Sequence, residues 1–270
     1  MTEHALNAER AGVKALSGSA MKIYLINLDR HPERLAHMRR QLDGVAFERV
    51  SAIDGATRPP TTKGLTRFEL ACLESHRTAW QKFLASTDSV ACFLEDDVHV
   101  QPGFAALLSG AKWPPKDAHA VKLDTYFQKV RLGEKLSASG DRKVARLYSR
   151  HESAAAYILS RGGAARYLEL TESARQPADY AVFPNSPRRL GLNIYQLIPA
   201  IAIQDHLLKD GRRFATAMAK TDSGAAAGRS SLVGKLGRES ARLASHVSSL
   251  GEWAYQKAFL RVETTTVGLE

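Results

Sequence analysis

Three carboxylates in a row, Glu95, Asp96 and Asp97, are the residues of this chain most suited to chemistry. Adjacent carboxylates repel one another and are costly to leave unpaired, so a cation is their natural partner. A hard divalent ion, which prefers oxygen ligands, fits best. A solvated acidic turn is the alternative interpretation of the same three residues.

The residues before this acidic run favour a built site. Residues 90–94 are all apolar, which predicts a strand buried on both faces, as in a parallel α/β sheet. In open sheets of this kind, ligands bind outside the carboxyl ends of the strands. Residues 120–123, which are apolar except for Lys122, have the pattern of a second short strand that ends at Asp124, and a last apolar strand at 197–203 is soon followed by Asp205. Strand ends that carry acids could converge on one cation.

The start of the predicted domain has the pattern of a nucleotide site. A strand is expected at residues 22–28, and Pro32 suits the first position of the helix that follows. A first strand that leads into a helix opening is a usual place to hold a nucleotide. Arg30 and Arg34 lie near that opening, where they either meet phosphate or are solvated. There is no GxGxxG motif, so the dinucleotide-binding fingerprint is absent.

Other polar residues have roles that the pattern leaves open. Thr66 and Glu69 form a capping box that predicts a helix, and His76 falls on its apolar stripe, where satisfied core-edge histidines are commoner than ligands. Asp179 falls in the first turn of a short helix, where the helix dipole alone would favour a carboxylate. A second strand is predicted at residues 47–52, and the polar residues 130–141 are expected to form a mobile loop.

Composition limits the classes of function. The chain has 270 residues, enough for one large α/β domain or a domain with an appendage, and its net charge of +10 points to anionic partners. Those partners could be phosphate-bearing substrates, acidic lipid surfaces or nucleic acid. With only two cysteines, Cys72 and Cys92, the chain has neither a disulfide framework nor a CxxC metal pattern. No stretch reaches the roughly 18 apolar residues of a membrane span.

Three regions are predicted along the chain. Residues 1–20 form a flexible lead without the apolar core of a signal peptide, and residues 21–219 form the folded domain. Residues 220–270 begin with a Gly-, Ala- and Ser-rich linker and continue as a basic amphipathic helical tail. Such a tail packs on the domain, pairs with another helix or lies on an anionic membrane surface.

Seven short stretches, in the expected order, resemble the motifs of glycosyltransferase family 25. They are residues 26–30 with Arg34, 69–80, 93–98, 121–125, His151 with 156–161, 177–179, and 199–205. The family includes bacterial lipooligosaccharide β-galactosyltransferases and collagen galactosyltransferases. The resemblance covers about residues 21–210, so it includes neither the lead nor the tail.

The resemblance implies a fold and a reaction. The fold would be of the GT-A type, an α/β and Rossmann-like arrangement with a mixed, mostly parallel sheet flanked by helices, to which the C-terminal helical appendage is added. The reaction would be inverting transfer of a hexose, typically galactose, from a UDP-sugar to a saccharide hydroxyl of a lipopolysaccharide or lipooligosaccharide acceptor. A divalent ion, Mn²⁺ or Mg²⁺, would neutralise the charge that grows on the departing UDP.

The resemblance also suggests roles for individual residues. Asp97 is the first choice for the metal contact, and Glu95 and Asp205 are further candidate ligands. Asp179 is the first choice for the base that inversion requires, and Asp124 and Asp205 are its rivals. His151 would contact the diphosphate or the acceptor. The donor-binding set is Asn27, Asp29, Arg30, Arg34, His76, Glu95 and Asp96.

These roles imply partners and a location. The expected partners are a UDP-hexose and a lipid-linked oligosaccharide, with no nucleic acid. The enzyme would be cytoplasmic, with peripheral association at the inner face of the membrane through the basic tail. The main alternative is a non-catalytic sugar-binding or adhesion protein of the same fold. A nucleotidyltransferase, which consumes a nucleoside triphosphate, would also use strand-end carboxylates and a metal, whereas a basic nucleic-acid-binding protein would explain only the charge.

Overall fold

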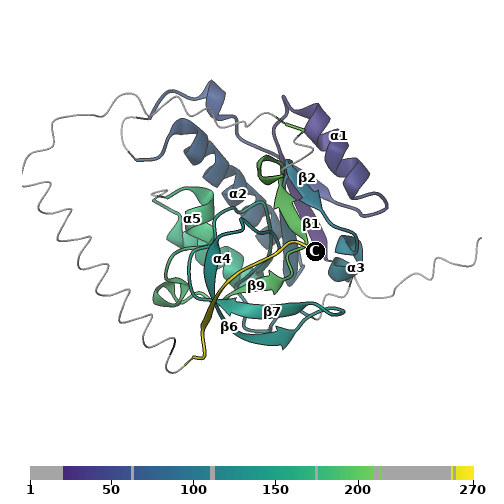
Figure 1. Cartoon of the computed structure of the whole chain (residues 1–270). Coiled ribbons are helices and arrows are strands. Elements are labelled where there is room, and N and C mark those ends of the chain that lie inside the picture. Colours follow the sequence, from purple (N-terminus) through teal and green to yellow (C-terminus); the bar gives the residue numbers. More distant parts are fainter. Residues whose placement is uncertain are drawn as a thin grey trace, which may run out of the picture.

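A computed structural model of the chain describes residues 21–61, 64–109, 113–173, 176–208, 213–214, 257 and 260–270. Its centre is a nine-stranded sheet (Figure 1). In chain order its strands are β1 (Lys22–Asn27), β2 (Glu48–Ser51), β3 (Val90–Glu95), β5 (Ala120–Lys122), β6 (Lys129–Ser137), β7 (Lys143–Leu147), β8 (Ala156–Ser160), β9 (Ile194–Ile198) and β11 (Glu263–Thr266). Their spatial order is β11-β6-β7-β9-β5-β8-β3-β1-β2.

The strand directions make the sheet mixed. Strands β2, β1, β3, β5, β9 and β6 run one way, whereas β8, β7 and β11 run against them. The predicted α/β fold with a mixed sheet is therefore confirmed. Six of the nine strands share one direction, but three of the eight neighbouring pairs are parallel and five are antiparallel. A separate antiparallel pair, β4 (Val98–Val100) with β10 (Ala202–Gln204), continues the chain beyond the ends of β3 and β9.

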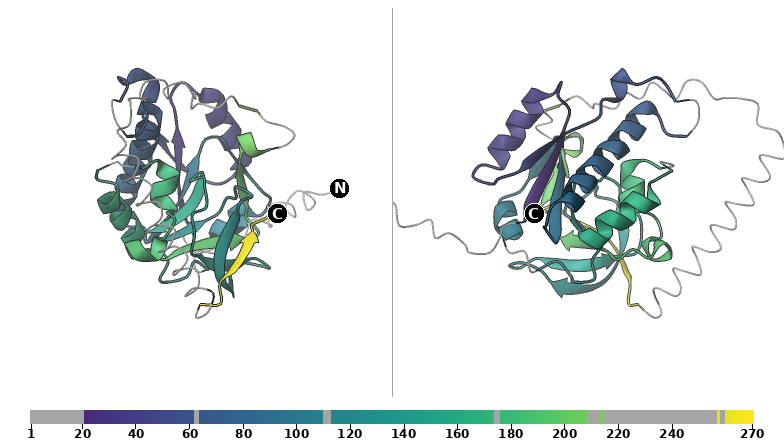
Figure 2. Two further views of the ribbon diagram at one scale, coloured as in Figure 1. Left: turned by 60° about the vertical axis from the view of Figure 1, so that its left-hand side comes forward. Right: turned by 180° about the vertical axis from the view of Figure 1, so that it is seen from behind.

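Helices cover both faces of the sheet (Figures 1 and 2). One face packs against α2 (Arg67–Ala85), α4 (Arg161–Leu170) and α5 (Ala178–Val182), and the other against α1 (Pro32–Gln41) and α3 (Phe104–Ser109). The alternation of a strand explains this division: Tyr24 and Ile26 of β1 belong to the first core, whereas Ile23 and Leu25 belong to the second. The apolar runs are thus buried on both faces, as the sequence predicts.

The entry to α2 is fixed by local chemistry. The Thr66 hydroxyl accepts the Glu69 amide at 3.2 Å, and the Glu69 carboxylate accepts the Thr66 amide at 2.8 Å, which completes the predicted capping box. The short 3₁₀ helix η1 (Gly55–Thr57) lies against this helix start. A Cβ atom on Gly55 would lie 2.8 Å from the Phe68 Cα, so only glycine allows this close approach.

Two predictions about the second half of the chain are wrong. Residues 130–141 do not form a mobile loop, because most of them belong to β6, which pairs with β7 and β11. The tail is not helical throughout, because Glu263–Thr266 forms β11 at the sheet edge, with Glu263 opposite Leu132. In both cases the strand depends on a partner far away in the sequence. Residues 1–20 and 215–256, with the predicted lead and most of the tail, lie outside the described residues.

Two smaller 3₁₀ helices complete the architecture: η2 (Pro187–Leu190) and η3 (Asp205–Leu207). Among the described helices, none combines the length and the apolar character needed to cross a membrane.

Candidate active site

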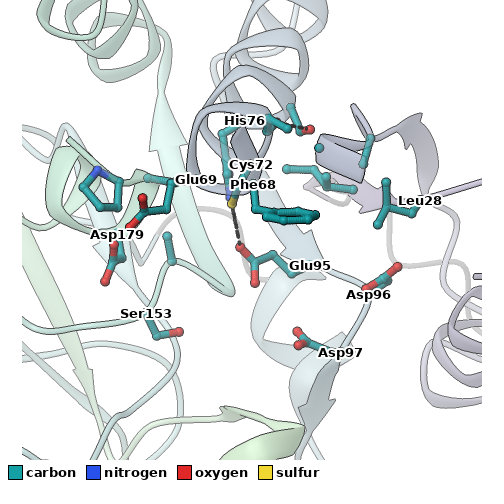
Figure 3. A pocket seen from close by; sticks show the side chains of 18 of the residues that line it. Leu28, Phe68, Glu69, Cys72, His76, Glu95, Asp96, Asp97, Ser153 and Asp179 are labelled. Carbon is teal, nitrogen blue, oxygen red and sulfur yellow. Dashed lines mark hydrogen bonds and ion pairs between the residues drawn. The ribbon is translucent and has the colours of Figure 1, made fainter. Parts of the chain in front are cut away.

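A cavity of about 440 Å³ opens where β1 and β3 end, between α2 and α5. Figure 3 shows Glu95 near its centre, with Leu28 and Asp96 on one side and Ser153 and Asp179 on the other. Seven carboxylates line this cavity against two arginines, Arg30 and Arg34. The acidic residues are Asp54, Glu69, Glu95, Asp96, Asp97, Glu152 and Asp179. A site of this charge attracts cations even though the whole protein is basic.

Asp96 is held in place by the first strand and helix. Its two carboxylate oxygens accept hydrogen bonds from the Asn27 side chain at 2.7 Å and from Arg34 at 3.1 Å. Burial raises the pKa of Asp96, although Asn27 and Arg34 oppose that shift. The predicted nucleotide-binding segment and the predicted acidic motif thus meet in space, with Asp96 already paired by protein groups.

Glu95 is oriented by a buried chain of hydrogen bonds. Its Oε1 contacts His76 Nε2 at 3.0 Å, and His76 Nδ1 lies 2.7 Å from the Tyr157 hydroxyl, which accepts the Trp80 indole N–H at 2.9 Å. The buried Tyr157 hydroxyl has one proton to donate, and His76 Nδ1 is its acceptor. His76 Nε2 therefore carries the imidazole proton and donates a hydrogen bond to Glu95. The amide of Gln204 donates to the other oxygen, Oε2, at 3.0 Å.

Asp97 differs from its two neighbours because one of its buried oxygens, Oδ1, has no hydrogen-bond partner among the described residues. Its Oδ2 lies 3.9 Å from an Arg34 nitrogen. Burial, followed by the charges of Glu95 and Asp96, raises the pKa of Asp97 to about 7. An unpaired buried oxygen of this kind is costly unless a ligand satisfies it. A carboxylate next to others is suited to a divalent cation.

The far wall comes from α5 and from the loop before β8. Asp179 lies in the first turn of α5, and Glu152 and Ser153 line the same part of the cavity. Burial raises the pKa of Asp179, and the charges of Glu95 and Glu152 add to that shift. A carboxyl group with a raised pKa at the wall of a cavity can take a proton from a bound hydroxyl.

The cavity also has an apolar surface, away from Asp179. Leu28, Ile53 and Phe68 line it, and Arg30 lies at its edge, where its Nε is 2.7 Å from an Asp54 carboxylate oxygen. Asp29 points elsewhere: it is 73% exposed, pairs with Arg49 and accepts the Ser51 hydroxyl at 2.8 Å. Arg49 is the main reason that the pKa of Asp29 is lowered. Asp29 and Asn27 are thus the two members of the predicted nucleotide-binding segment that do not line the cavity, whereas Arg30 and Arg34 do.

Three other predicted residues are not brought into the cavity. Asp124 is fully buried and accepts Lys122 Nζ at 2.8 Å, and the Ser153 hydroxyl donates to its other oxygen. His151 is also buried: its Nε2 accepts the Tyr126 amide at 3.1 Å, so Nδ1 donates to the Gln196 side-chain oxygen at 2.7 Å. Burial lowers the pKa of His151 to about 3, which keeps the ring neutral.

The third is Asp205, whose carboxylate is occupied by the protein. It accepts His99 Nε2 at 2.8 Å and the backbone amides of Arg213 and Phe214 at 2.9 to 3.1 Å. Burial raises the pKa of Asp205, but these hydrogen bonds outweigh burial and hold it below its usual value. The next residue, His206, lines the cavity instead.

Several cavity residues were not singled out as site residues from the sequence. Cys72 stands four residues before His76, and its Sγ lies 4.0 Å from Glu95 Oε1, so its helical spacing was a usable signal. Gln204 and His206 follow a predicted strand end. Phe68, Tyr126, Glu152 and Ser153 lie at a helix start or in loops, where no periodicity indicated that they face a cavity.

Comparison with known proteins finds relatives of this chain. Residues 20–182 match the family described as glycosyltransferase family 25 (LPS biosynthesis protein). The lacto-N-neotetraose biosynthesis glycosyltransferase LgtB of Neisseria gonorrhoeae is 28% identical over 211 residues, which cover 68% of this chain and 75% of the relative. The lipooligosaccharide biosynthesis protein lex-1 of Haemophilus influenzae is 28% identical over 152 residues, 52% of this chain and 50% of the relative.

A solved structure is also similar, although distantly. It is that of a glycosyltransferase involved in the glycosylation of the major capsid of PBCV-1, with 12% sequence identity and a TM-score of 0.39. The similarity covers 68% of this chain and 93% of that one. The family match spans more than half of the chain and includes the strand ends that carry Asn27 and Glu95 to Asp97. The chain therefore belongs to glycosyltransferase family 25.

Proposed function

We propose that this chain transfers a hexose, with galactose as the first candidate, from a UDP-sugar to a saccharide hydroxyl with inversion of configuration. The observation that carries the proposal is the cavity itself, which has an apolar surface, a central set of carboxylates and Asp179 on the far wall. The apolar surface, formed by Leu28, Ile53 and Phe68, suits a uracil base. Family membership supports a transferase that uses a nucleotide-sugar donor.

The charge of the cavity supports a divalent ion as part of the donor complex. A sugar diphosphate is an anion, and seven carboxylates against two arginines would repel it. Asp97, with its unpaired buried Oδ1, would hold the ion. Glu95 and His206, which line the same cavity, are the further candidate ligands. When bound, a divalent ion neutralises the charge that develops on the leaving diphosphate. Asp205 is less suited, because hydrogen bonds from His99 and two backbone amides already occupy its carboxylate.

The protein groups then act as follows. Asp179, in its ionised form, accepts the proton of the acceptor hydroxyl while the hydroxyl oxygen forms a bond to the anomeric carbon. The bond between that carbon and the diphosphate oxygen breaks, and its electron pair leaves with UDP. Attack from the side opposite the leaving group inverts the anomeric configuration. Asp124 would not be this base, since it is enclosed by Lys122 and Ser153.

The acceptor is proposed to be a lipid-linked oligosaccharide of the lipopolysaccharide or lipooligosaccharide type. The names of LgtB and lex-1, which refer to lacto-N-neotetraose and lipooligosaccharide biosynthesis, support it. Work on such an acceptor would place the protein at the inner face of the cytoplasmic membrane, where the basic tail would bind anionic lipids. Replacing Lys235, Arg238 and Arg242 with glutamine should then reduce binding to anionic vesicles. These substitutions keep β11 paired with β6, whereas truncation of the tail would remove that strand from the sheet.

The decisive experiment measures UDP release from a panel of UDP-sugars with and without Mn²⁺. Asp97→Asn should abolish metal-dependent transfer of the one donor that the wild type uses, and Asp179→Asn should lower its kcat by about 10²–10⁴. Asp141→Asn, which changes an exposed carboxylate in the turn between β6 and β7, is the matched control and should behave as the wild type. A protein that binds glycosides but releases UDP from no donor would instead be the non-catalytic sugar-binding alternative.

A further inference from the structure

Among the described residues, three large apolar side chains are exposed: Phe127, Leu136 and Leu190. Phe127 is the most exposed of them, at 47%, and its φ of +54° lies in the left-handed region. A bulky residue adopts that conformation only when its surroundings enforce it, and such strain gathers at functional sites. Phe127 therefore needs an explanation other than folding of the core.

The loop that carries Phe127 is held from several directions. The Thr125 hydroxyl donates to the Val267 carbonyl at 2.7 Å and accepts the Phe127 amide at 3.1 Å. The buried His151 accepts the Tyr126 amide, and the Gln128 side chain donates to the Arg150 carbonyl at 3.0 Å. The backbone of residues 125–128 is thus fixed by groups that come from different parts of the chain. Phe127, the exposed apolar residue of this loop, is therefore attached to a backbone whose position is fixed.

The loop of residues 125–128 lies at the rim of the part of the cavity that contains Asp179. Tyr126, the residue before Phe127, lines the cavity, and so does Tyr180, the residue after Asp179. Burial, and then the charges of Glu152, Asp179 and Tyr180, raise the pKa of Tyr126, as expected if these groups share one wall. The guanidinium of Arg150 lies 4.1 Å from the centre of the Tyr180 ring. Aromatic rings beside carboxylates suit a saccharide, because rings pack on its C–H face while carboxylates accept its hydroxyl protons.

We propose that Phe127, at the end of the wall formed by Tyr126 and Tyr180, is the stacking platform for a pyranose ring of the acceptor. This inference rests on the proposed transfer to a saccharide and specifies where the acceptor binds. His151 then has a positioning role: its neutral Nε2 fixes the Tyr126 amide and with it the rim. Val267, close to the end of the chain, supports the same loop through Thr125.

The test compares Phe127→Ala with Leu136→Ala, a matched control because Leu136 is 46% exposed but lies near the C-terminal end of β6, opposite Val144, and not in the loop that carries Tyr126. The probes are methyl β-glycosides of glucose, galactose and N-acetylglucosamine as acceptors. Phe127→Ala should raise the acceptor KM by about tenfold, the size expected for loss of one aromatic stacking contact. Its KM for the UDP-sugar and its rate of UDP-sugar hydrolysis without acceptor should stay within twofold of the wild type, and Phe127→Trp should retain acceptor binding.

The outcomes separate this proposal from the proposed function. An unchanged acceptor KM in Phe127→Ala, or an equal increase in Leu136→Ala, overturns the platform while leaving transfer intact. If the wild type releases UDP from no donor, transfer fails, and binding of the same glycosides is measured directly by saturation-transfer NMR. Weaker glycoside binding in Phe127→Ala than in Leu136→Ala then supports the platform, and equal binding, or no binding by the wild type, overturns it.

Discussion

Replacing Asp97 with asparagine should make the metal-free protein more stable at pH 8 while removing the proposed metal ligand. The folded protein raises the pKa of Asp97 from its usual value of 3.8 to about 7. Because the folded-state pKa lies above the unfolded one, this group costs no stability below about pH 4, and its cost grows as the pH rises until it is complete above pH 7. About three pKa units at roughly 1.4 kcal/mol each set an upper limit of about 4 kcal/mol.

Asparagine has nearly the same shape and no charge, so it removes most of this cost but keeps a buried polar group. We expect a net gain of about 2 kcal/mol at pH 8, which raises the Tm by about 4–8 °C for a domain of this size. The gain should shrink as the pH is lowered from 8 to 5. If Asp97 holds the proposed ion, added Mn²⁺ should raise the Tm of the wild type and not that of the variant.

The measurement is thermal unfolding followed by circular dichroism in EDTA at pH 5 and pH 8, and then with Mn²⁺ at pH 8. Asp141→Asn is the control, since it also removes one negative charge but at an exposed turn. The reasoning would be refuted by an Asp97→Asn variant no more stable than the wild type at pH 8. A stability difference that does not change between pH 5 and pH 8 would refute it equally.

The remaining predictions concern the other walls of the site. Tyr157→Phe removes the hydroxyl proton that fixes the His76 tautomer, so His76 would no longer hold Glu95 in place. The kcat should then fall about 10- to 100-fold, with the UDP-sugar KM less affected. An unchanged kcat would show that the hydrogen-bond chain only supports the core. Asp179→Asn should lower kcat by about 10²–10⁴ with unchanged UDP-sugar binding by calorimetry, and normal transfer would exclude it as the base. Thr125→Val should lower the free energy of unfolding by about 1–3 kcal/mol in urea, because it leaves buried backbone groups unpaired, whereas Thr125→Ser should not.

Several features of the site could be predicted because they depend on neighbours in the sequence. A run of apolar residues before Glu95 indicated a buried strand, and Thr66 with Glu69 indicated a helix start. Parallel pairing of β1 with β3 then brings Asn27 and Asp96 to the same edge, where the sequence had placed both groups. Strand length, strand direction and caps are local properties, so a pattern of a few residues is enough to specify them.

The orientation of a side chain at a strand end is not local. Asp179 faces the cavity, but Asp124 is enclosed by Lys122 and Ser153, and Asp205 by His99 and two backbone amides. The sequence pattern treated all three carboxylates alike, because each follows an apolar run or begins a helix. Their differences come from partners many residues away, which decide whether a carboxylate is already neutralised or still able to bind a ligand.

The order of the residues alone is therefore enough to predict the α/β class, the first strands and their helices, and the acidic motif at the sheet edge. Three features emerge only from the fold: β11 completes the sheet beside β6, the Tyr157 hydroxyl sets the tautomer of His76, and the exposed Phe127 follows the cavity residue Tyr126 in a loop held by Thr125 and His151. The physical reason is the range of the interactions. Periodicity and capping act within a few residues, whereas pairing of β-strands, burial of charge and placement of a proton depend on groups that only folding brings together.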